Sequence, residues 1–129
     1  MPPIATPEGT TDPGSATVRD LCDHWQVSED TVRAILARHG IAPIGVGRQR
    51  YRWVEIWMIE KEAWLPAWEW PAHREPLLRP TDLPARDPRG RSDRTFRRLL
   101  ASGAIPSILL SPGVRRVRAS VFERVVGNV

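Results

Sequence analysis

The chain has 129 residues, of which 41% are hydrophobic and 26% charged, a composition that excludes disorder throughout and suits one or two small domains. No apolar run approaches the length of a membrane-spanning helix, so we expect no membrane partner. The net charge of +4 is unevenly placed, with +7 after residue 78 and −3 before it, which predicts an anionic partner for the C-terminal half.

A tail and a short helix are the first elements expected. Residues 1–16 are rich in Pro, Thr and Gly and lack the features of a secretion signal, so we expect a flexible tail and a cytoplasmic protein. Apolar residues at helical spacing then predict a helix of about two turns over residues 17–25, with Gln26 and Val27 as the bend after it.

The next segment, residues 28–37, returns in similar form at residues 92–101. Both copies begin with a serine that can cap a helix and with acidic residues that the helix dipole favours. An apolar stripe follows in each copy, Val32, Ile35 and Leu36 in the first and Phe96, Leu99 and Leu100 in the second. The repetition predicts two copies of one small domain, over residues 17–62 and 78–129.

Each repeated helix precedes a predicted two-stranded wing around a glycine-containing turn. The strands are expected at residues 44–46 and 50–53 in the first copy and at residues 107–110 and 115–118 in the second. Alternation along the returning strands predicts that Tyr51, Trp53 and Val117 point inward and that Arg50, Arg52, Arg116 and Arg118 point to solvent.

The second copy differs from the first ahead of its helix. Residues 80–91 hold too many prolines for a long helix, so we expect a single helical turn begun by Thr81 and an irregular loop.

A connector rich in tryptophan and proline joins the copies over residues 63–77. Its indoles, Trp64, Trp68 and Trp70, lie among glutamates and need an apolar partner. They are interpreted either as a core between the two domains or as an exposed patch that docks a partner protein such as an integrase, RNA polymerase or a second copy. Stacking on unpaired bases is disfavoured, because the glutamates would repel a phosphate backbone.

The order of helix, tight turn, helix and wing resembles the excisionase and MerR-like family of winged helix-turn-helix DNA-binding domains. Residues 50–57 and 116–122 resemble the family's hairpin where it runs into a short closing helix. The resemblance covers residues 17–62 and, less cleanly, 78–126. It implies an α+β fold, mainly α with small β-hairpin wings, built of two tandem winged helix-turn-helix units. It also implies that the second helix of each unit enters a major groove of double-stranded DNA while the wing reaches the backbone or minor groove.

Arginines predict where the DNA would be contacted. The candidates are Arg94, Arg97 and Arg98 on the second unit's helix, Arg115, Arg116 and Arg118 on its wing, and Thr31, Arg33, Arg48, Gln49, Arg50 and Arg52 in the first unit. Glu29 and Asp30 would face phosphate, so we expect weaker binding by the first unit. The sequence leaves two interpretations of the first unit open. It either reads a cytosine amine through a carboxylate or binds a protein instead of DNA.

The expected function is sequence-specific binding of double-stranded DNA by a nucleoid-associated protein of a mobile element or prophage, monomeric or weakly self-associating. An excisionase-like recombination directionality factor and a local transcription regulator both fit. A terminase small subunit is a further alternative, and an adapter that binds proteins through its tryptophans and acidic first half is the alternative from another class. No enzyme activity, cofactor or metal is expected, because His24 and His39 have a single cysteine beside them and no phosphate-binding glycine motif is present.

Overall fold

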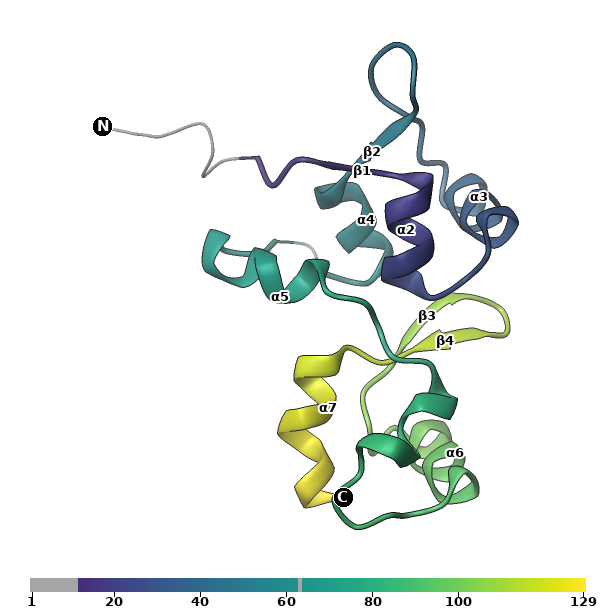
Figure 1. Ribbon diagram of the computed structural model, residues 1–129, viewed down its shortest axis with the longest axis vertical. Helices are drawn as coiled ribbons and strands as arrows, with labels where there is room; N and C mark the ends of the chain where they lie inside the picture. Colours follow the sequence, from purple (N-terminus) through teal and green to yellow (C-terminus); the bar gives the residue numbers. More distant parts are fainter. Residues whose placement is uncertain (1–11, 63) are drawn as a thin grey trace.

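In the computed structural model, which describes residues 12–62 and 64–129, the chain is α+β, as the sequence predicts. Short helices accompany two separate antiparallel sheets of two strands each within the described residues. Figure 1 shows the N-terminal half above and the C-terminal half below, with the second sheet between them. No helix of the described residues has the length and apolar character needed to cross a membrane.

The first half consists of β1 (Ser15–Thr17), α2 (Val18–Trp25), α3 (Glu29–Arg38), β2 (Arg50–Arg52) and α4 (Trp53–Ile59). A capping box begins α2, since the Asp20 N–H donates to Thr17 Oγ1 (3.1 Å) and the Thr17 N–H donates to Asp20 Oδ2 (2.9 Å). Gln26, in the left-handed conformation, ends this helix. The predicted helix and bend are therefore confirmed.

The first sheet corrects two expectations about strands. Its strands β1 and β2 pair antiparallel, with Ala16 opposite Tyr51, whereas residues 44–46 contribute only an isolated bridge between Ile44 and Arg50. Burial explains why β2 pairs with β1 and not with residues 44–46. Ala16 and Tyr51 are 0% and 6% exposed, while the loop over residues 45–49 is exposed throughout. The predicted tail thus ends before Ser15, and its residues 1–11 lie outside the described part.

The connector contains η2 (Ala67–Glu69) and α5 (Trp70–Arg74). The second half consists of η3 (Pro80–Asp82), η4 (Pro84–Arg86), α6 (Asp93–Ser102), β3 (Ile108–Ser111), β4 (Val114–Arg116), α7 (Ala119–Val125) and η5 (Val126–Asn128). The prolines limit residues 80–86 to two short 3₁₀ helices, one more than predicted, around the fully buried Leu83. Gly103, at φ 82°, ends α6 as a left-handed cap.

Each half has its own hydrophobic core, but the second wing belongs to both. Phe96 and Phe122 stand in the second core, with ring centroids 5.9 Å apart. Leu110 of β3 is fully buried in the core of the first half, together with Trp25 and Trp57. The hairpin β3–β4 is therefore packed against the first half rather than projecting freely into solvent.

Polar contacts strengthen this junction. Arg116 donates through Nε to Trp25 O (2.8 Å) and through Nη2 to Gln26 O (2.9 Å). Both carbonyls lie at the C-terminal end of α2, where a cation also interacts favourably with the helix dipole. His39, which follows α3, has its Nε2 3.0 Å from Leu110 O, so the ends of α2 and α3 both hold the hairpin.

A buried charged network lies beside the same junction and centres on Glu60. Its Oε2 accepts hydrogen bonds from Trp25 Nε1 (2.8 Å) and His24 Nε2 (2.7 Å), and its Oε1 accepts from Arg118 Nη2 (2.5 Å). Burial by itself would raise the pKa of Glu60, but the hydrogen bonds and charges of His24 and Arg118 outweigh it and hold the pKa below its ordinary value. Glu60 is thus an ionised, fully buried carboxylate.

His24 is a second partner of that carboxylate and also contacts the segment after α5. Its Nδ1 lies 2.9 Å from Glu75 O and 3.2 Å from Arg74 O, and these carbonyls only accept hydrogen bonds. Its Nε2 faces the Glu60 carboxylate, which also accepts. The ring therefore links the Glu60 carboxylate to the backbone at Arg74 and Glu75.

Candidate nucleic-acid interface

The helices α3 and α6 are equivalent in the two halves, as the sequence repeat predicts. Their caps have the same geometry, since the Thr31 N–H donates to Ser28 Oγ at 3.3 Å and the Thr95 N–H donates to Ser92 Oγ at 3.2 Å. The apolar stripes are buried or half-buried in their cores, as expected. Each helix therefore presents its opposite face to solvent.

The exposed face of α6 is basic. Arg94, Arg97 and Arg98 are all exposed there, and only Arg97 has an ion-pair partner among the described residues, Asp93, with Nε and Oδ2 3.0 Å apart. Both members of this pair remain largely exposed, at 71% and 42%, so the guanidinium stays accessible to another anion. Three accessible arginines on one helical face suit a polyanion.

The exposed face of α3 is not equally basic. Positions that correspond to the three arginines hold Asp30, Arg33 and Ala34, and Arg33 pairs with Glu29 over 3.3 Å. Charge therefore differs between two helices of the same geometry.

A hollow of about 260 Å³ adds positive charge beside α3. Arg19, Arg33 and Arg48 line it from α2, α3 and the loop before β2, together with Gln49 and Glu29. Sequence reasoning included Arg33, Arg48 and Gln49 but missed Arg19. Arg19 could have been found from the start of α2, because Thr17 caps this helix and so places Arg19 in its exposed first turn.

The other candidates of the first half lie around this region. Arg50 and Arg52 are exposed, as predicted, and Thr31 is half-buried. The Arg50 guanidinium donates to Ser15 Oγ (2.8 Å) and Ser15 O (2.9 Å), so this side chain also holds β1 to β2.

The second wing corrects the prediction that its arginines point to solvent. Arg118 is 4% exposed and paired with Glu60, and Arg116 is half-buried on the end of α2. Arg115 is half-buried and donates to Ser107 Oγ (2.6 Å). The alternation rule failed here because Arg116 lies against the end of α2 and Arg118, just after β4, pairs with the buried Glu60. Arg118 is therefore not accessible to a ligand.

Several further arginines of the second half also have structural roles. Arg91 pairs with Asp87, with Nε and Oδ2 2.9 Å apart, and its hydrogen bonds hold the pKa of Asp87 well below its ordinary value. Arg89 donates to Gly127 O (3.1 Å), which ties the chain end to this loop. Part of the positive charge after residue 78 therefore serves the fold, whereas the three arginines of α6 remain exposed on one helical face.

The connector does not form the core between the halves that one interpretation expected. Trp64 and Trp68 are 78% and 81% exposed, and only Trp70 is partly buried against the first core. The seam is instead made by Leu110, Arg116 and the Glu60 network. The two exposed indoles fit the alternative interpretation, a docking patch.

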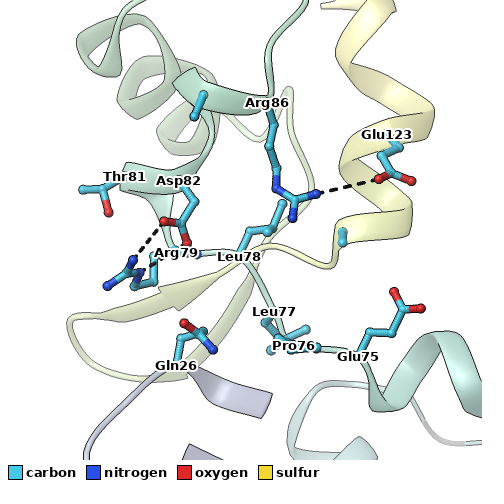
Figure 2. A pocket seen from close by; sticks show the side chains of 12 residues that line it. Gln26, Glu75, Pro76, Leu77, Leu78, Arg79, Thr81, Asp82, Arg86 and Glu123 are labelled. Atoms are coloured by element: carbon cyan, nitrogen blue, oxygen red, sulfur yellow. Dashed lines mark hydrogen bonds and ion pairs between the residues drawn. The ribbon is translucent and has the colours of Figure 1, made fainter. Parts of the chain in front are cut away.

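A cleft of about 480 Å³ opens between the two halves (Figure 2). Its walls include the ion pairs Arg79–Asp82 (3.0 Å) and Arg86–Glu123 (3.8 Å), with Glu75 at the edge. Positive and negative groups are mixed around it, so this cleft offers no field for a polyanion and is separate from the basic face of α6.

In Figure 1, α3 and α6 lie on the same side of the molecule, with the turn between β3 and β4 between them, and α7 lies on the other side. No cluster of histidine, cysteine and acidic side chains that could hold a metal ion occurs in the part of the chain that the structure describes. Comparison of the chain with protein-family models, with curated proteins and with solved structures gave no match.

Proposed function

We propose that the protein binds double-stranded DNA as two tandem winged helix-turn-helix units, with α6 as the principal reader. One observation carries the proposal, namely that Arg94, Arg97 and Arg98 share the exposed face of a helix whose opposite face is anchored in a core. An α-helix fits a major groove, and an arginine can form two hydrogen bonds with guanine or pair with phosphate.

The first unit would contact a neighbouring part of the same duplex. Arg33, Arg48 and Gln49 line the hollow beside α3, and Arg19 extends it toward α2. Glu29 and Asp30 at the start of α3 would oppose phosphate, so this unit would contribute less affinity than α6. Arg52 is available for a backbone contact at the exposed edge of β2.

The second wing would serve a different purpose from the one that the resemblance implies. Its arginines hold the two halves together, which supports a fixed separation between α3 and α6. A single chain with two dissimilar reading helices would recognise an asymmetric site, without the two-fold symmetry that a homodimer requires.

The biological role proposed is that of an excisionase-like recombination directionality factor or a local transcription regulator, in the cytoplasm and associated with the nucleoid. A role like that of a terminase small subunit is a further alternative. These roles share the DNA interface and differ in the sites that they occupy.

Duplex binding at several salt concentrations tests the proposal. The logarithm of the affinity should fall with the logarithm of salt concentration by about 0.9 for each phosphate neutralised, so several contacts give a slope of several units. Arg94→Gln and Arg98→Gln should each weaken binding about tenfold or more to a site selected from random duplexes.

Arg124→Gln is the matched control. It removes the same charge from an exposed position on α7, away from α6 in Figure 1, so it should change affinity only slightly. Equal losses from all three variants would show that overall charge and not the α6 face binds DNA. Absence of duplex binding at low salt would refute the proposal itself.

A further inference from the structure

We propose that Trp64 and Trp68, together with Val54 of α4, form a docking surface for a proline-rich, basic peptide segment of a partner protein. This tryptophan surface is distinct from the face of α6 and does not depend on DNA binding. All three side chains are exposed, Trp64 by 78%, Trp68 by 81% and Val54 by 44%. Indoles exposed to this extent are typical of sites that another molecule covers.

The backbone that carries the indoles is held in place. Trp70 Nε1 donates to Leu65 O (3.0 Å), which closes the segment on itself, and the Glu69 N–H donates to Pro66 O (2.9 Å) in the turn of η2. Trp57 Nε1 donates to His73 O (3.0 Å) and so ties the end of α5 to α4. A surface prepared in this way loses little conformational entropy when it binds a ligand.

Proline already occupies part of this surface. A hollow of about 100 Å³ is lined by Val54, Trp64, Trp70 and Pro13 of the chain itself. Pro13 is buried there, and its carbonyl accepts a hydrogen bond from Arg74 Nη2 (2.6 Å). Grooves lined by aromatic rings are the usual receptors of polyproline II segments, which are extended before they bind.

The exposed indoles also offer hydrogen-bond donors. Trp25, Trp57 and Trp70 each donate through Nε1 to an acceptor within the chain. For Trp64 and Trp68, the part of the chain that the structure describes provides no such acceptor. A polyproline II segment presents unpaired carbonyls to its receptor, and these indoles are placed to donate to them.

Charge around the surface selects basic flanks for that peptide. Residues 53–75 contain Glu55, Glu60, Glu62, Glu69 and Glu75 against a single lysine, Lys61, and a single arginine, Arg74. Glu60 is buried and neutralised by its partners, and Glu62 lines the hollow itself. The remaining carboxylates attract lysine or arginine beside the prolines and repel nucleic acid or an acidic peptide.

The experiment uses the full chain and three synthetic peptides of about ten residues. The first holds consecutive prolines flanked by arginines, the second replaces the prolines by serine, and the third replaces the arginines by glutamate. Binding is followed through the indole N–H signals in NMR spectra, assigned with Trp64→Phe and Trp68→Phe, and the affinity is obtained by titration.

The arginine-flanked proline peptide should shift the signals of Trp64 and Trp68 and bind about tenfold or more tightly than either control peptide. Trp64→Ala should weaken that binding about tenfold, whereas Val46→Ala, which changes a fully exposed apolar residue in another loop, should leave it unchanged. Because Trp64 is so exposed, its replacement should not unfold the protein, and an unchanged thermal unfolding curve checks this.

Three results would overturn the proposal. One is no binding of the proline peptide, or equal binding of the serine or glutamate peptide. Another is unaltered affinity in Trp64→Ala and Trp68→Ala. The last is concentration-dependent self-association, seen by sedimentation and abolished in these two variants, which would show that a second copy covers the surface. Failure of duplex binding would leave this proposal unaffected.

Discussion

Replacement of Arg118 by methionine tests whether the buried network joins the two halves. The guanidinium is 4% exposed and pairs at 2.5 Å with Glu60, whose side chain is fully buried. Methionine keeps most of the apolar stem and removes the charge. The Glu60 carboxylate then keeps His24 and Trp25 as partners but loses the hydrogen bond that Oε1 accepts from Arg118.

The magnitude follows from the cost of breaking a buried ion pair. Removal of one partner from such a pair costs roughly 3–5 kcal/mol, and the remaining His24 contact places Arg118→Met near the lower value, about 3 kcal/mol. Glu60→Gln leaves the buried Arg118 guanidinium without its counterion, so its cost should lie in the same range, up to about 5 kcal/mol. Either loss is large beside a total unfolding free energy of roughly 5–15 kcal/mol.

Urea unfolding at neutral pH measures these losses. With a slope of about 1–3 kcal/mol per molar urea, Arg118→Met should lower the midpoint by roughly 1–3 M. Arg118→Lys, which keeps a charge but loses the planar fork, should recover part of the loss. Arg86→Met is the matched control, since Arg86 and Glu123 are 3.8 Å apart and half or more exposed, and it should cost less than about 1 kcal/mol.

Two outcomes would refute the reasoning. The first is a loss in Arg118→Met no larger than that of Arg86→Met. The second is a loss in Arg118→Lys as large as that in Arg118→Met, because the charge would then contribute nothing to the junction.

Three further predictions concern stability. The folded-state pKa of Glu60 lies below its ordinary value of 4.5, so the stability it contributes is present above that pH and is lost as pH falls through the folded pKa. Urea midpoints measured from neutral pH to about pH 2 should therefore decline less steeply in Glu60→Gln than in the natural chain, and parallel declines would contradict the assignment. Leu110→Ala should cost about 2–5 kcal/mol in urea unfolding, because this leucine is fully buried in the first core, whereas the half-exposed Leu109→Ala should cost less than about 1 kcal/mol. Ser28→Ala and Ser92→Ala should each cost about 1 kcal/mol in thermal unfolding, since both hydroxyls accept from a first-turn amide, and a loss in only one variant would contradict the equivalence of α3 and α6.

Local features were predictable where the interaction that decides them spans only a few residues. The cap of Ser28 and the stripe of Val32 lie within one helix, so the sequence pattern is enough to locate α3. The same argument holds for α6 and for the turn at Gly113, where the hairpin forms with strand ends shifted by one or two residues. The prolines of residues 80–91 were also sufficient to exclude a long first helix in the second half.

Pairing across long sequence distances was not predictable. Ser15–Thr17 is a strand only because β2, more than thirty residues later, offers free backbone groups and a buried place for Ala16. A three-residue segment after a proline- and glycine-rich stretch carries no periodic signal of its own. The burial of Glu60 was not predictable for the same reason, since its partners come from α2 and from Arg118.

The sequence by itself determined the repeated helices, their caps, their buried stripes and the basic face of α6, because backbone hydrogen bonding and side-chain periodicity act within a few residues. Only the tertiary structure decided which arginines remain accessible. Arg98 and Arg118 are chemically identical, yet one lies in solvent and the other meets a buried carboxylate 58 residues away. An arginine's role depends on which group neutralises it, and long-range packing determines whether that group lies within the chain or outside it.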